Sequence, residues 1–310
     1  MTPEADPEPA SRQERLDGLI GIDLGATNVR IARIERGELA ELRAEPIVRS
    51  ADPDDLIEQI AGMVRQVMDP GVKSIGIGVP SVVDPVKGIV YDVQNIPAWK
   101  QVPLGPILEQ RFGVPVAINN DANCFALGEW AFGAGRDAAV ASPNENAERG
   151  GALVGLILGT GFGAGLIVNG RLWSGVNCGA GEVGMLPYRD SIYEHYCSGQ
   201  FFERVHKIGG AELHARAMDG DAGARAVFDE FGEHLGMGLQ AVLYAYDPGL
   251  IVLGGSVSGA FPFFEAAMRR ALQSFAYPLS LESLRIVPST LEHPGVLGAA
   301  VLALDAGRVS

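Results

Sequence analysis

The sequence has little cysteine, no excess of positive charge and no long apolar run. Its three cysteines, Cys124, Cys178 and Cys197, are odd in number and form no Cys-x-x-Cys pair. A disulfide framework is therefore not expected, and a reducing compartment, the cytoplasm by default, is favoured. Lysine and arginine total 24 against 38 aspartate and glutamate, a net charge of −14. Such a charge repels nucleic acid and anionic membranes, so any phosphate site should be local and built mainly from backbone groups.

The sequence also lacks the patterns of membrane insertion and secretion. No apolar run has the length of a membrane span, and the N-terminus has no basic start followed by an apolar stretch. Residues 1–16 are rich in proline and acidic residues and are expected to form a disordered tail, and residues 142–149 an exposed loop. What is present is 47% hydrophobic residues in a chain of 310, enough for a packed core and long enough to favour two domains.

One type of segment occurs twice: an apolar strand, a glycine-rich turn, and a second apolar strand that ends in a polar turn. The first copy has the turn Gly25-Ala26-Thr27-Asn28, and the second has the turn Gly159-Thr160-Gly161. Backbone N–H groups exposed at such turns bind anions. Two of them in equivalent halves can grip a polyphosphate from both sides, so we expect a duplicated fold that closes on a nucleotide.

Hydrophobic periodicity predicts strands and helices in both halves. The expected strands are 19–24, 28–34, 39–46 and 75–79 in the first half, and 152–158, 165–168 and 250–253 in the second. A helix is expected from Asp52-Pro53 to residue 67, and another over 221–246. Strands followed by helices, repeated in two halves, imply an α/β fold with mixed sheets flanked by helices.

The two copies differ at one informative position, because Asp23 in the first copy is Ile157 in the second. A strand that is otherwise apolar tolerates a carboxylate poorly unless the carboxylate is paired or near a metal. Asp23 is therefore a candidate for organising Mg²⁺ through water beside a phosphate. Capping of the turn is the alternative.

A second candidate centre is Asn119-Asn120-Asp121-Ala122-Asn123, where a strand is expected to end and a helix to begin. Asp121 can accept the proton of an attacking alcohol while Asn120 holds a neighbouring hydroxyl. The residues alone fit a polar helix N-terminus equally well, because Asp and Asn are favoured caps. Glu182 and Glu194 are carboxylates among small and aromatic residues, which suits the hydroxyls of a carbohydrate.

In combination these motifs resemble the ROK family of sugar kinases, within the actin-like ATPase superfamily, over residues from about 19 to 305. The matching segments are Ile22-Asp23-Leu24-Gly25-Ala26-Thr27-Asn28, Gly78-Val79-Pro80, Val83-Asp84, Gly88-Ile89-Val90, Asn95-Ile96-Pro97-Ala98-Trp99, Asn120-Asp121-Ala122-Asn123, Leu158-Gly159-Thr160-Gly161-Phe162-Gly163, Gly181-Glu182-Val183-Gly184, Asp247-Pro248, Ile251-Val252-Leu253-Gly254-Gly255 and residues 295–300.

The resemblance implies a two-lobed actin-like (ribonuclease H-like) fold, with a small lobe of residues 17–120 and 295–308 and a large lobe of residues 121–294. It implies ATP-dependent phosphorylation of the 6-hydroxyl of a hexose, glucose first, with fructose, mannose or an N-acetylhexosamine as alternatives. ATP and Mg²⁺ would be the cofactors, and a homodimer the expected assembly.

The resemblance also assigns roles to residues. Asp121 would be the general base, and the sugar hydroxyls would be held by Asn95, Asn120, Glu182 and Glu194. The nucleotide side would be formed by Asp23, Gly25, Ala26, Thr27, Asn28, Gly159, Thr160, Gly161, Gly254 and Gly255, with Asp23 holding Mg²⁺ through water.

The sequence departs from the family on the sugar side. Met185 stands where family members commonly carry a His that binds a structural zinc and touches the sugar, and the cysteine-rich zinc loop is missing, so we expect no zinc site. Ser81 replaces a usual Gly, which would narrow or redirect the sugar pocket. Sugar-responsive repressors, a second possibility, carry a helix-turn-helix domain before the first turn, where this sequence has only about 20 residues. A non-catalytic sugar or nucleotide sensor is a third.

Overall fold

The computed structural model describes residues 16–138 and 151–306, and the chain divides into two compact units. The first unit comprises Met1–Asp121 and Val296–Ser310, and the second comprises Ala122–Gly295. Most of the expected acidic tail and the expected loop at 142–149 lie outside the described residues. Leu16, the last residue of that expected tail, is 5% exposed and belongs to the hydrophobic core.

The first unit is built on a five-stranded sheet with the order β3-β2-β1-β4-β8. Its strands are β1 (Leu19–Leu24), β2 (Asn28–Glu35), β3 (Glu38–Pro46), β4 (Ser74–Val79) and β8 (Val116–Asn120). The first three form an antiparallel meander, and β4 and β8 add to β1 in parallel. All six residues of β4 are buried, which explains its continuous apolar sequence, because a parallel strand in the middle of a sheet is covered on both faces.

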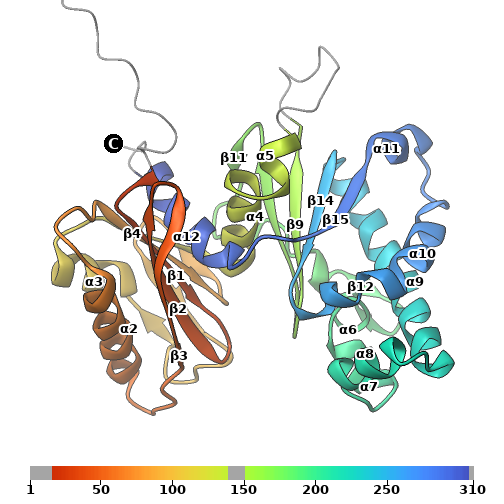
Figure 1. Cartoon of the computed structure of the whole chain (residues 1–310), viewed down its shortest axis with the longest axis horizontal. Helices are drawn as coiled ribbons and strands as arrows, with labels where there is room; N and C mark the ends of the chain where they lie inside the picture. The colour runs from red at the N-terminus through yellow and green to blue at the C-terminus, as the bar shows by residue number, and fades with distance from the viewer. Residues whose placement is uncertain (1–15, 139–150, 307–310) are drawn as a thin grey trace, which may run out of the picture. The chain divides into compact units, whose positions relative to one another are not determined.

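Helix α12 (Pro294–Ala306) lies directly on the backbone of the two central strands of this sheet. A Cβ added at Gly21 of β1 would stand 2.0 Å from the Val296 carbonyl oxygen, and one at Gly76 of β4 would stand 1.6 Å from that of Ala299. Only glycine permits this approach. Figure 1 shows α12 on one side of the sheet and α2 (Pro53–Val67) on the other.

The remaining elements of the first unit are one helix and a small sheet. They are α3 (Leu104–Phe112) and the strands β5 (Val83–Asp84), β6 (Ile89–Tyr91) and β7 (Gln101–Val102), which pair in the order β5-β6-β7. Helix α2 begins as the sequence predicts: the Asp52 side chain caps it by accepting from the Asp54 N–H, and Pro53 occupies the first position.

The second unit repeats the sheet of the first with the same strand order and directions. Its order is β11-β10-β9-β14-β15, with β9 (Leu153–Leu158), β10 (Phe162–Val168), β11 (Arg171–Leu172), β14 (Leu250–Gly254) and β15 (Arg285–Pro288). Strands β9, β10 and β11 are antiparallel, and β14 and β15 add in parallel. The duplication expected from the two glycine-rich segments is thus a duplication of topology.

Strand β10 begins at Phe162, three residues before the predicted start at Gly165. The glycines at the start of β10 favoured the prediction of a turn there. Close packing against a neighbouring helix requires them instead. A Cβ at Gly165 would stand 2.3 Å from the Ala122 carbonyl oxygen. The strand therefore carries glycine because helix α4 (Asp121–Ala131) runs close beside it.

Helices and short segments surround this second sheet. They are α5 (Ala134–Ala138), η2 (Val183–Met185), β12 (Pro187–Tyr188), β13 (Ser191–Ile192), α6 (Glu194–Cys197), α7 (Gln200–Val205), α8 (Gly210–Met218), α9 (Ala222–Tyr246), η3 (Ser256–Ala260), α10 (Phe261–Leu272) and α11 (Pro278–Ser283). Within the two described ranges, no helix is both long enough and apolar enough to cross a membrane.

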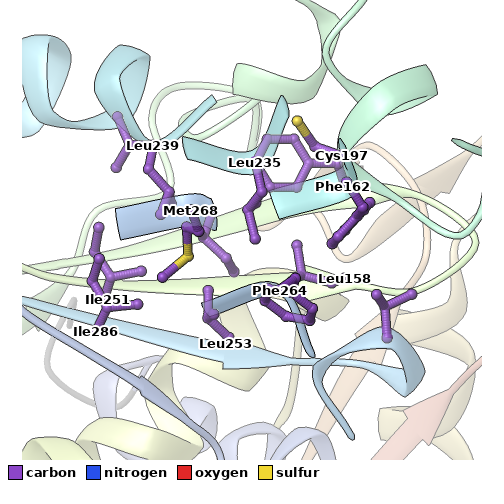
Figure 2. Close-up of a cluster of buried hydrophobic side chains, with 14 of the residues drawn as sticks. Leu158, Phe162, Cys197, Leu235, Leu239, Ile251, Leu253, Phe264, Met268 and Ile286 are labelled. Carbon is purple, nitrogen blue, oxygen red and sulfur yellow. The ribbon is translucent and has the colours of Figure 1, made fainter. Parts of the chain in front are cut away.

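The core of the second unit forms where α9 and α10 cover one face of the sheet. Figure 2 shows Leu158, Ile251 and Ile286 from the strands meeting side chains of the two helices. Close packing of the helices depends on glycine here as well, because a Cβ at Gly232 would stand 2.5 Å from the Phe264 carbonyl oxygen. Burial of this cluster fixes the strand ends that carry the glycine-rich turns.

Candidate functional site

The carboxyl ends of three neighbouring parallel strands meet at one edge of the first sheet. Asp23 on β1 is in register with Gly78 on β4, and Gly78 with Asn119 on β8. Asp121 follows directly as the first residue of α4. Because open α/β sheets bind ligands at the carboxyl ends of their strands, the fold brings Asp23, Asn120 and Asp121 to the edge where a site is expected.

The first glycine hairpin, the turn of residues 25–28 between β1 and β2, is closed by its own backbone. The Gly25 N–H donates to the Asn28 carbonyl at 3.0 Å, and the Asn28 amide donates to the Thr27 hydroxyl at 3.0 Å. Thr27 is exposed at the tip. The turn is therefore a fixed and accessible loop, which suits the binding of an anion by backbone groups.

Arg30 is a charged neighbour of Asp23 that the sequence reasoning missed. Its Nη1 lies 3.4 Å from Asp23 Oδ2, and the two side chains are 36% and 22% exposed. The signal was present in the sequence, because a hairpin closed at residues 25–28 places residue 30 opposite residue 23 on the neighbouring strand. Asp23 thus fulfils the expectation that a carboxylate in this strand is paired.

Asn119 and Asn120 tie the end of β8 to the loop after β4. Asn119 is 3% exposed and its Oδ1 accepts from the Asn120 N–H at 2.8 Å. The Asn120 amide donates to the Ser81 carbonyl at 3.4 Å, and the Ser81 hydroxyl donates to the Tyr91 carbonyl on β6. The hydroxyl that distinguishes Ser81 from glycine is therefore bonded to a neighbouring strand.

Asn95 lies on the loop between β6 and β7 and is exposed. The loop is anchored by Trp99, which is fully buried and whose Nε1 donates to the Pro53 carbonyl at 3.0 Å. The structure therefore holds the loop of Asn95 in place against the start of α2.

In the second unit, Glu182 and Glu194 come within electrostatic reach of each other. Glu182 precedes η2 and Glu194 begins α6. Glu182 is exposed, yet its pKa is raised, first because neighbouring protein atoms remove part of its hydration and second because of the negative charge of Glu194. The fold thus brings together two carboxylates that are 12 positions apart in the sequence.

The second glycine hairpin, the turn of residues 159–161 between β9 and β10, lies at the carboxyl edge of the second sheet. Its Gly159 N–H donates to the Gly161 carbonyl at 3.1 Å, and Thr160 is exposed at the tip. Gly254 on β14 is in register with Ile157, and Gly255, with φ of +82°, approaches so closely that a Cβ would stand 2.4 Å from the Leu158 carbonyl oxygen. The glycines of the second unit that were predicted for the nucleotide side, Gly159, Gly161, Gly254 and Gly255, therefore lie at one edge of its sheet.

Comparison with known proteins identifies the family. The model of the ROK family matches residues 19–306. The chain belongs to the ROK family. A glucokinase of Thermotoga maritima is 28% identical over 316 residues, covering 91% of this chain and 96% of that protein. An N-acetyl-D-glucosamine kinase of Pasteurella multocida is 32% identical over 319 residues, covering 92% and 99%.

The fold agrees with this assignment. The crystal structure of a ROK hexokinase from Thermus thermophilus superposes with a TM-score of 0.76 at 26% identity, covering 94% of this chain and 99% of that one. The predicted family and the predicted two-lobed actin-like α/β fold are confirmed, and this ROK protein is an ATP-dependent sugar kinase.

The segment between Glu182 and Glu194 in the sequence of this ROK kinase carries a cluster of aromatic rings. The rings of Tyr188 and Tyr193 stack with centroids 4.4 Å apart, and the Tyr188 hydroxyl bonds His234 Nδ1 at 3.0 Å. Burial, together with the charge of Arg189, lowers the pKa of His234 to about 4. In the described part of the chain, no group of three or more His, Cys, Asp or Glu side chains is placed to hold a metal ion.

Proposed function

We propose that this ROK kinase transfers the γ-phosphoryl group of ATP to the 6-hydroxyl of a hexose, with glucose as the first candidate. The observation that carries the proposal is the position of Asp121, which follows β8 at the same sheet edge as Asp23 and Asn120. A carboxylate there can accept the proton of the attacking hydroxyl. The names of the relatives, glucokinase and N-acetyl-D-glucosamine kinase, support a hexose as the acceptor.

The other residues would bind and orient the two substrates. Asn95, Asn120, Glu182 and Glu194 would hold hydroxyls of the sugar. Backbone N–H groups of residues 25–28 and 159–161, apart from those of Gly25 and Gly159 that close the two turns, would contact the phosphates. Gly254 and Gly255 would leave room for the nucleoside. Held in this way, the hydroxyl and the phosphoryl group react as an oriented pair.

Asp23 fits a role in binding Mg²⁺ through water. It is a hard oxygen donor, partly buried at the end of β1 beside the first glycine hairpin, which is the kind of ligand that Mg²⁺ prefers. A bound Mg²⁺ supplies neutralisation of charge on the phosphate oxygens. Arg30 orients the Asp23 carboxylate from the neighbouring strand.

The sugar would be selected by residues around Glu182. Met185 is the last residue of η2, the short helix that follows Glu182, and is 58% exposed, so it offers an apolar surface close in sequence to this carboxylate. Glucose, fructose, mannose and N-acetylhexosamines are the acceptors to compare. Turnover with ATP across this panel ranks them by kcat/KM.

We further propose that the protein works in the cytoplasm as a homodimer, with residues 17–120 and 295–308 acting as a small lobe and residues 121–294 as a large lobe. Light scattering coupled to size-exclusion chromatography measures the assembly directly.

The variant Asp121→Asn tests the reaction itself. Asparagine keeps the size of the side chain and cannot accept the proton, so kcat should fall by about 10² to 10⁴ in an assay of ADP release. The matched control is Asp219→Asn, an exposed aspartate after α8, which should turn over like the wild type. Near-normal turnover of Asp121→Asn would show that the proposed base is wrong.

A further inference from the structure

Residues 194–200 lie against the second glycine hairpin and contact the carbonyl groups of Gly159 and Thr160. The Gly199 N–H donates to the Gly159 carbonyl at 2.7 Å. The hydroxyl of Ser198, which is fully buried, lies 3.3 Å from the Thr160 carbonyl oxygen. The turn proposed to contact phosphate is therefore shaped by the segment that begins with the proposed sugar ligand Glu194.

Gln200 links the second glycine hairpin to Glu194 through its side-chain amide group. Its Nε2 donates to the Thr160 carbonyl at 3.1 Å and to Glu194 Oε1 at 3.1 Å. Both partners are acceptors, so chemistry requires the NH₂ end of the side chain at this point. The two hydrogen atoms of one nitrogen thus link the tip of the hairpin to the carboxylate.

Glu194 also contacts the hairpin directly. Its Oε2 accepts from the Phe162 N–H at 3.2 Å, and a Cβ at Gly161 would stand 2.8 Å from the same oxygen. One carboxylate oxygen therefore lies against the end of the turn and the other is held by Gln200. A movement of this carboxylate would therefore alter its contacts with Phe162 and Gln200.

The far side of residues 159–162 and 194–200 is packed into the core of the second unit. Phe162 and Cys197 are buried side chains of the core in Figure 2, and both lie against Gly238 of α9. The ends of the two segments are thus fixed in the core, and Glu194, Gln200 and the tip at Thr160 are the parts that can respond to a ligand. Packed interiors transmit small shifts rather than absorbing them.

We propose that Gln200 is a positioning residue that couples the binding of the sugar at Glu194 to the conformation of the second glycine hairpin, so that hexose and nucleotide bind cooperatively. The coupling rests on the proposed function, in which Glu194 holds a sugar hydroxyl. A sugar hydroxyl that donates to Glu194 would bond the same carboxylate that accepts hydrogen bonds from the Phe162 N–H and the Gln200 amide. By linkage, the nucleotide strengthens sugar binding by the same factor as the sugar strengthens nucleotide binding.

Calorimetric titration of a non-hydrolysable ATP analogue, with and without saturating hexose, measures this coupling. In the wild type the hexose should tighten binding of the analogue by about fivefold or more. Gln200→Ala removes the hydrogen bonds to Thr160 and Glu194. Gln200→Glu places a carboxylate, which cannot donate, against the Thr160 carbonyl and the Glu194 carboxylate. In both variants the effect of the hexose should fall below about twofold. Gln273→Ala, at an exposed glutamine after α10, is the control and should keep the wild-type coupling.

Hydrogen exchange at the amide of Phe162 provides a second measurement that needs no substrate. The amide should exchange faster in Gln200→Ala than in the wild type, because its acceptor Glu194 loses a restraint. Unchanged coupling in a folded Gln200→Ala protein, or unchanged exchange at Phe162, overturns the proposal. A wild type that phosphorylates none of the hexoses overturns the proposed function instead, and the exchange measurement then still decides the role of Gln200.

Discussion

Glu182 and Glu194 form an interacting pair in which each carboxylate has a different environment. Glu194 accepts hydrogen bonds from the Phe162 N–H and the Gln200 amide. Glu182 is placed where lost hydration and the charge of Glu194 raise its pKa. Glu194 is therefore fixed to the second glycine hairpin, whereas Glu182 becomes protonated at a higher pH than an ordinary glutamate.

We expect sugar binding to weaken in acid through Glu182. Its raised pKa means that the carboxylate is ionised above this value and becomes protonated as the pH falls through it, earlier than for an ordinary glutamate. A protonated carboxyl loses acceptor capacity for hydroxyls. Hexose affinity measured as a function of pH should decline as Glu182 becomes protonated. In Glu194→Gln the negative charge that helps to raise the pKa of Glu182 is removed, so the midpoint of this decline should move to lower pH. An unmoved midpoint would contradict the assignment to this pair.

The positions of some site residues could be predicted from the sequence, and those of others could not. Asp23, Asn120 and Asp121 lie in contiguous motifs at strand ends, so their shared edge could be predicted once the strands were recognised. Arg30 and Gln200 carry no motif of their own. Arg30 is located by hairpin register, and Gln200 only by the packing of α7 beside the turn at Thr160, which no local pattern encodes.

At the level of elements, the long periodic segments were predicted closely and the short ones were not. Strand β1 has the predicted bounds, and α9 begins at Ala222, one residue after the expected start. Strands β12 and β13 have two residues each, too few for a period-two pattern to be recognised. The aromatic contacts of Tyr188 and Tyr193 organise this hairpin instead.

The contact of α12 with the first sheet predicts a large difference between two Gly→Ala substitutions. In Gly76→Ala the new Cβ would meet the Ala299 carbonyl oxygen at 1.6 Å, so helix and sheet must separate, at a cost of about 3 kcal/mol or more in the free energy of unfolding. In Gly62→Ala, within α2, nothing lies within 4 Å of the new Cβ, and a gain of about 0.5 to 1 kcal/mol is expected from helix propensity. Urea unfolding followed by circular dichroism compares them, and equal stabilities would contradict the close packing.

At the scale of the whole molecule, one sheet topology is used twice with different chemistry at its edge. Each sheet consists of an antiparallel meander of three strands followed by two parallel strands. In each, a glycine hairpin follows the first strand of the meander. Only the first copy carries a carboxylate, Asp23, where the second has Ile157. The topology could be predicted because the repeat is visible in the sequence. The difference in function resides in a few side chains that a common backbone presents.

The net charge of −14 predicts an unusual dependence of nucleotide binding on salt. The proposed phosphate contacts are backbone N–H groups of two turns, so an anionic nucleotide approaches a protein that repels it at long range. Salt screens this repulsion, with a Debye length of about 10 Å at 0.1 M. The KM for Mg-ATP should therefore fall or stay constant between about 20 and 200 mM KCl, while the KM for the uncharged hexose serves as the control and should not change. A KM for Mg-ATP that rises with salt would show that cationic side chains such as Arg30, rather than backbone groups, dominate the capture of phosphate.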